Sequence, residues 1–304
     1  MQKNVFFVKK VSKSSLYNII FIHIMSFYLY FCSALTRVLN IGGELSELSL
    51  PLVMAIVNAT DDSFYAASRC MSSDDIRKRA EQAIADGADI IDIGACSTRP
   101  NSVPVDEDTE WKNLRTALSV VRKHLPEVLL SVDTFRAGIA RRAVSEFGPM
   151  IINDVSGMSD VMMADVLCEY NVPYVLTYCG ESEAETEEQY MSDSIDWLQK
   201  KKNTLYQAGV TDIIIDPGFG FNKTYAQNWF LLKNLNCLEI FGKPVLVGVS
   251  RKSMLQKMFG TTAEGLLNAT TATHMVALQK GADILRVHDV KEAKEAITIY
   301  MQTK

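Results

Sequence analysis

Short runs of β-branched and other apolar residues recur along the chain, and each gap between two runs leaves room for a helix. The runs cover residues 52–57, 90–93, 129–132, 150–153, 174–177, 212–215, 245–249 and 284–287. Amphipathic helical patterns lie between them, at 73–86, 107–124, 136–147, 185–208, 225–241 and 265–280, and a last one starts at Val290. Strands that alternate with helices predict parallel βα units and therefore an α/β protein.

The number of units favours a single (β/α)8 TIM barrel, with a doubly wound open sheet as the alternative. The chain has 304 residues, 48% of them hydrophobic, and can bury the core of such a domain. No linker rich in Pro, Gly or Ser divides residues 39–304, so we predict one barrel domain there. Residues 39–49 are too short for a βα unit, and we expect a short N-terminal hairpin that plugs the bottom of the barrel.

Residues 1–38 form an N-terminal extension of different composition. Four lysines precede an apolar and aromatic run from Leu16 to Leu35, which ends in small residues. This order is typical of a signal peptide or membrane anchor. We favour the alternative of an over-long start, with translation beginning at Met25 or nearby, because the remainder has the pattern of a soluble enzyme. We therefore expect a cytoplasmic protein, with a membrane as partner only if residues 16–35 are retained.

Charge and cysteine spacing argue against two further classes. The formal net charge is −5, and Lys and Arg are scattered among Asp and Glu without a basic stripe, so we expect no nucleic acid partner. The six cysteines are widely spaced, with no CxxC pair and no Cys/His cluster at metal-ligand spacing. They predict reduced, structural thiols rather than a zinc site.

Polar residues follow the predicted strands at the face where barrel enzymes build their active sites. They are Asn58, Asp92, Thr98, Arg99, Asp133, Thr134, Asn153, Asp216, Ser250, Arg251, Lys252, Arg286, His288 and Asp289. A single residue of this kind is often a turn former or a helix cap, and we assign Thr134 and Asp289 to such roles. The set as a whole predicts an active site.

The acidic and amide members of this set fit a nitrogen-rich ligand. Asp92, Asp133, Asn153 and Asp216 would point carboxylates and an amide toward the barrel mouth, where they can accept the adjacent N–H donors of an amino-pyrimidine ring. Lys252 and Arg286 would balance their charge.

The last strand offers a place for an anion. Arg286 and His288 stand at positions i and i+2, so both point the same way, at a place that often holds phosphate in barrels. A solvated strand end is the alternative for this pair.

The segment 213–223 (IIIDPGFGFNK) is the most unusual stretch. Pro217 ends its strand, and two glycines allow tight turns that we expect to expose Phe219 and Phe221. The glycine spacing is neither GxGxxG nor that of a P-loop. Phe221 is a candidate wall for a flat substrate, with simple packing as the alternative.

Taken together, these motifs resemble those of dihydropteroate synthase over residues 38–304. The matching stretches are 54–64 (MAIVNATDDSF), 89–100 (DIIDIGACSTRP), 131–134 (SVDT), 152–154 (IND), 216–223 (DPGFGFNK), 248–253 (GVSRKS) and 286–290 (RVHDV). Each stretch alone is weak, but their order and spacing are specific. The resemblance implies condensation of 6-hydroxymethyl-7,8-dihydropterin pyrophosphate with p-aminobenzoate, Mg2+ as cofactor, and a homodimer.

The resemblance also implies roles for individual residues. The pterin ring would be held by Asp133, Asn153, Asp216, Lys252 and Arg286. The pyrophosphate would be bound by Asn58, Thr98, Arg286 and His288, with the metal beside Asn58. The p-aminobenzoate would meet Thr98, Arg99, Pro100, Phe221 and Ser253. The candidate catalytic residues are Lys252, Asp133, Arg99 and Asp62.

Departures from the family pattern lie in the loops after the early strands. Asp61 replaces a proline, and Ala66 and Ala67 occupy a position that is usually acidic. We expect Asp61 or Asp62 to take the place of the missing carboxylate. Ala95 and Cys96 replace a glycine and a glutamate. An active synthase is our prediction, and a catalytically weak pterin-binding paralogue, acting as a regulatory or partner subunit, is the alternative. A pterin-dependent methyltransferase is disfavoured, because it should lack the 250–253 and 286–288 motifs.

Overall fold

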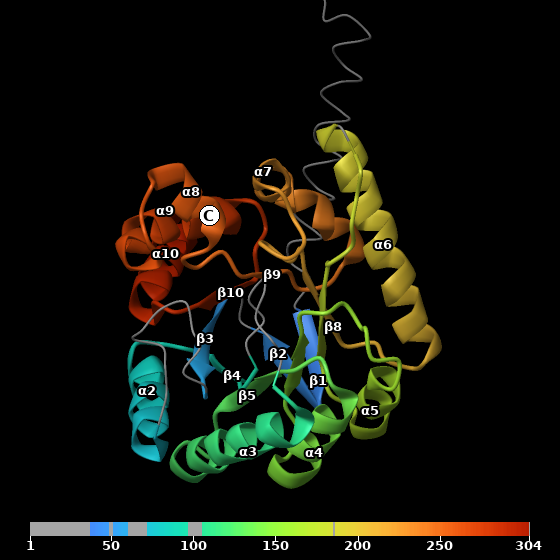
Figure 1. The fold of residues 1–304 in the computed structure, drawn as a ribbon, viewed down its shortest axis with the longest axis vertical. Coiled ribbons are helices and arrows are strands. Elements are labelled where there is room, and N and C mark those ends of the chain that lie inside the picture. The colour runs from blue at the N-terminus through green and yellow to red at the C-terminus, as the bar shows by residue number, and fades with distance from the viewer. Residues whose placement is uncertain (1–36, 49–50, 60–71, 97–104, 185, 304) are drawn as a thin grey trace, which may run out of the picture. The chain divides into compact units, whose positions relative to one another are not determined.

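Eight parallel strands form a ring in a computed structural model of the chain (Figure 1). The structure describes residues 37–48, 51–59, 72–96, 105–184 and 186–303. The strands are β3 Leu52–Asn58, β4 Ile90–Gly94, β5 Leu129–Asp133, β6 Ile151–Asp154, β7 Tyr174–Thr177, β8 Ile213–Asp216, β9 Leu246–Val247 and β10 Ile284–Val287. They pair in the order β8-β7-β6-β5-β4-β3-β10-β9. The ring closes where Ile215 bridges Val245 and donates its N–H to the Pro244 carbonyl at 2.8 Å. The predicted barrel is confirmed, and the open-sheet alternative is wrong.

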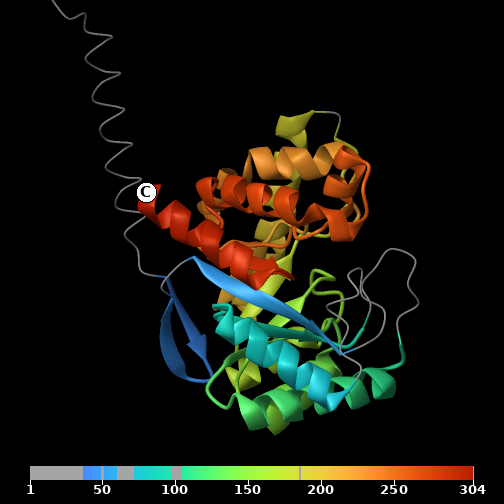
Figure 2. The same ribbon diagram turned by 90° about the vertical axis from the view of Figure 1, so that its left-hand side faces the viewer.

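The helices follow the predicted alternation and surround the strands (Figures 1 and 2). They are α2 Ser73–Ala85, α3 Glu107–His124, α4 Ala137–Phe147, α5 Met163–Tyr170, α6 Glu187–Gln207, α7 Tyr225–Lys233, α8 Ser253–Phe259, α9 Leu267–Gln279 and α10 Val290–Thr303, with 3-10 turns η2 Leu235–Phe241 and η3 Ala263–Leu266. The sequence pattern did not single out α5 and α8, because their 8 and 7 residues are too few for a clear helical period.

Two predicted elements are longer than the observed ones. Residues 225–241 do not form one helix: α7 ends at Lys233, where the Asn234 side-chain amide donates to the Phe230 carbonyl at 2.9 Å, and residues 235–241 continue as the 3-10 turn η2. The strand predicted at 245–249 is reduced to Leu246–Val247. The chain turns directly after it, since the Lys252 N–H donates to the Val249 carbonyl at 3.3 Å. This turn brings Lys252 to the carboxyl end of the barrel.

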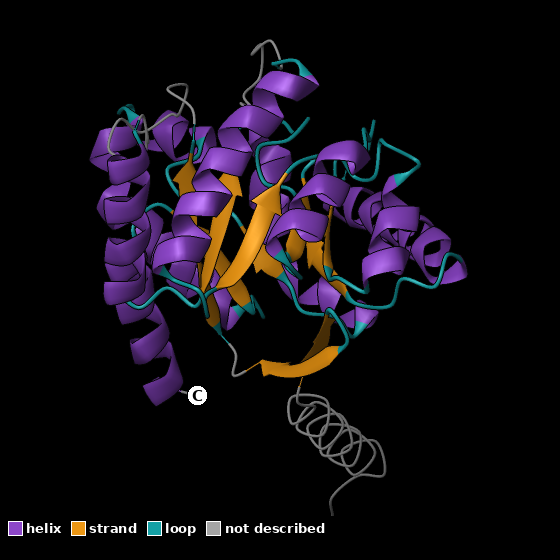
Figure 3. Ribbon diagram, turned by 90° about the horizontal axis from the view of Figure 1, so that it is seen from below, coloured by secondary structure: helices purple, strands orange, loops and turns teal. Residues whose placement is uncertain are grey.

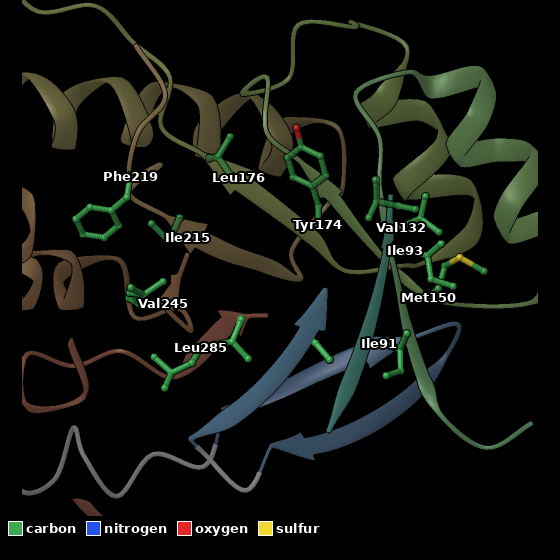
Figure 4. Close-up of a cluster of buried hydrophobic side chains, with 14 of the residues drawn as sticks. Ile91, Ile93, Val132, Met150, Tyr174, Leu176, Ile215, Phe219, Val245 and Leu285 are labelled. Atoms are coloured by element: carbon green, nitrogen blue, oxygen red, sulfur yellow. The ribbon is translucent and has the colours of Figure 1, made fainter. Parts of the chain in front are cut away.

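The hydrophobic core has an outer and an inner layer. Outward-facing strand residues such as Ile91, Val132 and Leu176 are buried between the strands and the helices (Figure 4). The inner layer, here called the barrel floor, consists of Met54, Ile90, Ile151, Val175, Ile214, Leu246 and Ile284. Every residue of the floor is at most 1% exposed. This layer closes the interior of the barrel below the carboxyl ends of the strands.

A hairpin covers the barrel floor from below, as predicted (Figure 3). Its strands are β1 Arg37–Ile41 and β2 Glu44–Leu48. Leu39 and Leu48 are buried against the floor residues. The Asn40 N–H donates to a carboxylate oxygen of Asp212 at 2.8 Å, which ties the hairpin to the loop before β8.

The apolar run at 16–35 lies outside the described residues, so both interpretations of it stay predictions. Among the helices that the structure describes, none is long and apolar enough to cross a membrane.

Candidate active site

A polar layer lies directly above the barrel floor because side chains alternate between the two faces of a strand. Position i+2 from an inward-facing floor residue also faces inward. Applied to Ile90, Ile151, Ile214 and Ile284, this rule gives Asp92, Asn153, Asp216 and Arg286. Asp133 belongs to the same layer, since it is paired in register with Asn153. The fold therefore gathers the predicted acidic and cationic groups inside one barrel.

Arg286 is the centre of this layer. Its Nε donates to Oδ2 of Asp92 at 2.7 Å, and its Nη2 donates to Oδ2 of Asp133 at 2.6 Å. The Asn153 amide donates to the same Asp92 oxygen at 3.1 Å. Burial alone would lower the pKa of Arg286, but the Asp92 and Asp133 carboxylates outweigh it and raise that pKa above its ordinary value. The guanidinium is therefore a permanent cation at the centre of the layer.

One cation for two buried carboxylates leaves an excess of negative charge. Burial raises the pKa of the Asp133 carboxyl to about 7; Arg286 opposes the shift and the Asp92 charge adds to it. A ligand that brings N–H donors or positive charge would offset this excess of negative charge. A carboxyl whose pKa lies so far above its ordinary value, in a barrel interior, marks a functional site.

Four buried polar atoms near these groups have no hydrogen-bond partner among the described residues. They are Oδ1 of Asp92, Oδ1 of Asn153, Oγ of Ser131 and Oγ1 of Thr177. These atoms lie on the neighbouring strands β4, β5, β6 and β7. An unsatisfied buried polar atom costs about 1–3 kcal/mol, so a group of them points to a polar ligand. The Oδ1 atoms of Asp92 and Asn153 can accept N–H donors from such a ligand.

The loop after β8 is fixed by Asp216. This residue is 5% exposed, and its Oδ1 accepts the Gly218 N–H at 2.7 Å. Burial raises the pKa of Asp216, while the Gly218 hydrogen bond and Lys252 oppose that shift. Gly218 has a φ of 68°, and a Cβ there would lie 2.2 Å from the Tyr178 carbonyl oxygen. Only glycine fits this approach of two loops.

The two phenylalanines of this loop differ. Phe219 is 1% exposed and belongs to the outer core, so the prediction that it is exposed is wrong. The cause is the turn at Gly218, which directs this side chain outward toward the helices (Figure 4). Phe221 is half-buried, and the Lys252 ammonium lies 4.3 Å from its ring centroid. Phe221 therefore stands beside a predicted site residue, as an aromatic wall requires.

Two lysines hold this loop. Lys252 Nζ donates to the Phe219 carbonyl at 2.7 Å, and Lys223 Nζ donates to the carbonyls of Tyr178 and Phe221 at 2.7 and 2.9 Å. Burial lowers the pKa of Lys252 to about 8, against the opposing charge of Asp216. Burial also lowers the pKa of Lys223 to about 7, again opposed by Asp216. The sequence pattern assigned no role to Lys223, although this residue belongs to the 216–223 motif and could have been identified as a site residue from it.

The predicted anion site lies next to the polar layer. His288 Nδ1 is hydrogen-bonded to Ser250 Oγ at 3.0 Å, and burial, together with the Arg286 charge, lowers the pKa of His288 to about 3. The imidazole is therefore neutral. Asn58 and Asp133 flank Gly94 on its two neighbouring strands, and a Cβ on Gly94 would lie 3.6 Å from Asn58 Oδ1 and 3.7 Å from Asp133 Oδ2. A cationic guanidinium, a neutral imidazole and an amide are thus available to bind an anion.

Comparison with known proteins agrees with this geometry. The model of the family "Pterin binding enzyme" matches residues 54–288. A dihydropteroate synthase from Bacillus subtilis is 39% identical over 251 residues, which cover 82% of this chain and 87% of that protein. The chain belongs to the dihydropteroate synthase family.

Solved structures of the family superpose closely. The dihydropteroate synthase of Coxiella burnetii in complex with pteroic acid has a TM-score of 0.82 at 31% identity, covering 88% of this chain and 98% of that one. The dihydropteroate synthase of Xanthomonas albilineans with 4-aminobenzoic acid has a TM-score of 0.79 at 32% identity, with the same two coverages.

The structure brings together most, but not all, of the residues predicted from the family resemblance. Asn58, Asp133, Asn153, Asp216, Phe221, Lys252, Arg286 and His288 lie at the carboxyl end of the barrel. Ser253 is the exposed first residue of α8, beside Lys252. The predicted roles of Asp62, Thr98, Arg99 and Pro100 fall on positions outside the described residues. Asp92, which received no role of its own, binds Arg286 and Asn153.

The two residues assigned to turns or caps have different outcomes. Thr134 Oγ1 accepts the Arg136 N–H at 3.3 Å before α4, as a turn residue does. Both carboxylate oxygens of Asp289 instead accept from the Arg251 guanidinium, so the assignment of this side chain to capping is wrong. The ion-pair partner is distant in the sequence and close only in the barrel.

Proposed function

We propose that this protein is a dihydropteroate synthase, which joins 6-hydroxymethyl-7,8-dihydropterin pyrophosphate to p-aminobenzoate and yields 7,8-dihydropteroate and pyrophosphate in folate biosynthesis. The observation that supports this proposal best is the polar layer above the barrel floor. There Asp92 and Asp133 bind the Arg286 cation, and Oδ1 of Asp92 and Oδ1 of Asn153 have no donor among the described residues. Family membership supports the same reaction. The related structures with pteroic acid and 4-aminobenzoic acid support its two substrates.

The pterin ring occupies this layer in our proposal. A pterin carries adjacent N–H donors on its pyrimidine half, and a carboxylate accepts two such bonds with good geometry. Asp133 and Asp216 are the proposed acceptors, and Oδ1 of Asn153, which has no partner among the described residues, takes a further donor. Arg286 and Lys252 lie beside these groups and offer cationic faces to the ring.

The pyrophosphate lies toward Asn58, Arg286 and His288. Among the described residues, no group of three or more His, Cys, Asp or Glu side chains could hold a metal ion. Mg2+ does not require such a cluster, since it keeps several waters and takes one or two protein ligands with substrate phosphates. Asn58 fits as one such ligand, because it ends β3 at the carboxyl end of the barrel and its side-chain oxygen lies over Gly94 of β4. Bound there, Mg2+ would offset charge on the departing pyrophosphate.

The proposed reaction is a displacement at the pterin methylene carbon. The bond from this carbon to the pyrophosphate oxygen breaks, a bond to the arylamine nitrogen forms, and the nitrogen releases one proton. Arg286 stabilises the leaving anion, and the carboxylates tolerate positive charge that develops on the pterin. The proposed entry side for p-aminobenzoate consists of Phe221, Ser253, Thr98, Arg99 and Pro100. Asp62 is the proposed carboxylate that stabilises the developing cation. None of these steps requires a covalent protein intermediate.

Turnover of the purified full chain tests the proposal. Pyrophosphate release from the pterin substrate is measured with and without p-aminobenzoate, in Mg2+ and in EDTA. We expect release that depends on p-aminobenzoate and on Mg2+, and that is lost in Lys252→Ala and Asp133→Ala. Pterin binding without turnover, not repaired by Ala67→Asp, would instead identify the paralogue. A cytoplasmic homodimer is part of the proposal, and light scattering tests the dimer.

A further inference from the structure

An ion pair ties the loop that carries Lys252 to the end of β10. Arg251 Nε and Nη2 donate to the two carboxylate oxygens of Asp289 at 2.8 and 2.9 Å. Arg251 Nη1 donates to the carbonyls of Ala263 and Glu264 at 2.5 and 3.0 Å. The side chains of the pair are 3% and 12% exposed. Protein acceptors thus enclose the Arg251 guanidinium, and this side chain is not placed to bind a ligand.

The Arg251 backbone is held as firmly as its side chain. Its φ of 56° lies in the left-handed region, which disfavours residues with a Cβ. Such a conformation persists only where the surroundings fix it. Here the Arg251 N–H also donates to the buried Oγ1 of Thr270 at 3.1 Å. These bonds set the direction in which the chain leaves Arg251 and enters Lys252.

A second link joins the same two segments one residue away. Ser250 Oγ accepts the His288 N–H at 3.3 Å and is hydrogen-bonded to His288 Nδ1 at 3.0 Å. Arg251 therefore lies between Ser250 and Lys252, and Asp289 follows His288 directly. Both residues of the ion pair adjoin a group that the proposed reaction uses.

We infer that Arg251 and Asp289 are positioning residues that fix Lys252, beside the proposed pterin site, relative to His288, at the anion site. The inference rests on the proposed function. A substrate that joins a flat ring to a diphosphate must meet both groups at once, so its binding depends on their separation. The ion pair acts through its neighbours and need not touch the substrate.

Asp289→Asn is the direct test in the full chain. This substitution keeps the size of the side chain, but leaves Arg251 without an opposing charge and with one acceptor oxygen in place of two. We expect KM for the pterin pyrophosphate to rise by about tenfold or more, while KM for p-aminobenzoate changes by less than about threefold. We also expect the alkaline limb of kcat/KM to move to higher pH, because a displaced Lys252 gains water. Asp289→Glu retains the carboxylate. Its KM for the pterin pyrophosphate and its alkaline limb should therefore lie closer to those of the parent than they do in Asp289→Asn.

Two further variants make the test specific. Glu146→Gln is the matched control, because it breaks the exposed pair in which Arg115 Nε lies 2.7 and 3.0 Å from the two Glu146 oxygens. This pair joins α3 to α4, away from the β9 and β10 loops, and its loss should change neither KM nor the pH limb. Ser250→Ala removes the second link without exposing a buried charge. It should raise the same KM even if Asp289→Asn fails to fold.

The outcomes separate the inference from the function on which it rests. Absence of turnover in the parent chain counts against the proposed function. Normal parent turnover, with KM and the pH limb unchanged in folded Asp289→Asn or in Ser250→Ala, overturns the inference alone. The inference is equally overturned if only the melting temperature and kcat fall, because a merely structural ion pair would have that effect.

Discussion

Lys252 gives the sharpest prediction, and the first perturbation is Lys252→Met at pH 7. The loss of a charged hydrogen-bond donor to the substrate costs about 1.5–3 kcal/mol. The loss of the cation–π contact that holds Phe221, 4.3 Å from the ammonium, adds about 0.5–2 kcal/mol. The sum of about 2–5 kcal/mol corresponds to a fall in kcat/KM of about 30- to 5000-fold.

The pH dependence assigns this effect to the charge. Since the pKa of Lys252 is lowered to about 8, the ammonium is present below that pH and is lost as pH rises through it. The kcat/KM of the parent should therefore fall above about pH 8. Lys252→Arg keeps a cation at all these pH values, so its profile should lack this limb even if its rate at pH 7 is lower.

A steady-state assay with the pterin pyrophosphate as varied substrate, from about pH 6 to pH 10, measures both effects. Lys223→Met is the control, because the pKa of Lys223 is also lowered, to about 7. Its alkaline limb should persist. The reasoning is refuted if Lys252→Arg retains the limb, if Lys223→Met loses it, or if Lys252→Met stays within about threefold of the parent.

Three further substitutions test the structure through stability. Burial raises the pKa of Asp133, so its contribution to stability is present in acid and is lost as pH rises through about 7. Asp133→Asn should therefore be inactive yet more stable by about 1–3 kcal/mol at pH 8, and nearly neutral at pH 5, in urea unfolding. Burial lowers the pKa of His274 to about 4, and both of its ring nitrogens lack partners among the described residues. His274→Leu should raise the free energy of unfolding by about 1–3 kcal/mol at pH 7. The difference should grow as pH falls from about 6.5 to 4, because the parent loses stability in this range. An equal gain at every pH would contradict this reasoning. Gly218→Ala should lower the unfolding free energy by more than about 2 kcal/mol. Gly260 also has a positive φ, of 60°, but nothing lies within 4 Å of a Cβ at this position, so Gly260→Ala should cost only about 1 kcal/mol. Equal losses would argue against the loop contact at Gly218.

The sequence determined the barrel and the chemical types at its mouth. Strand and helix periods are local properties, so β3 to β10 and most helices could be placed from them. The inward direction of Asp92, Asn153 and Arg286 follows from the two-residue period of a strand. These steps need only neighbours in the chain, and for that reason they were predictable.

Tertiary structure alone decided which of these groups meet. Arg286 binds Asp92 and Asp133, which lie 194 and 153 residues away along the chain, and Asp289 pairs with Arg251 instead of capping a turn. The burial of Phe219 and the lowered pKa of Lys223 likewise depend on how the loops after β7 and β8 pack. Burial, and the pairing of distant charges, are properties of the closed barrel, since no local stretch of sequence contains both partners.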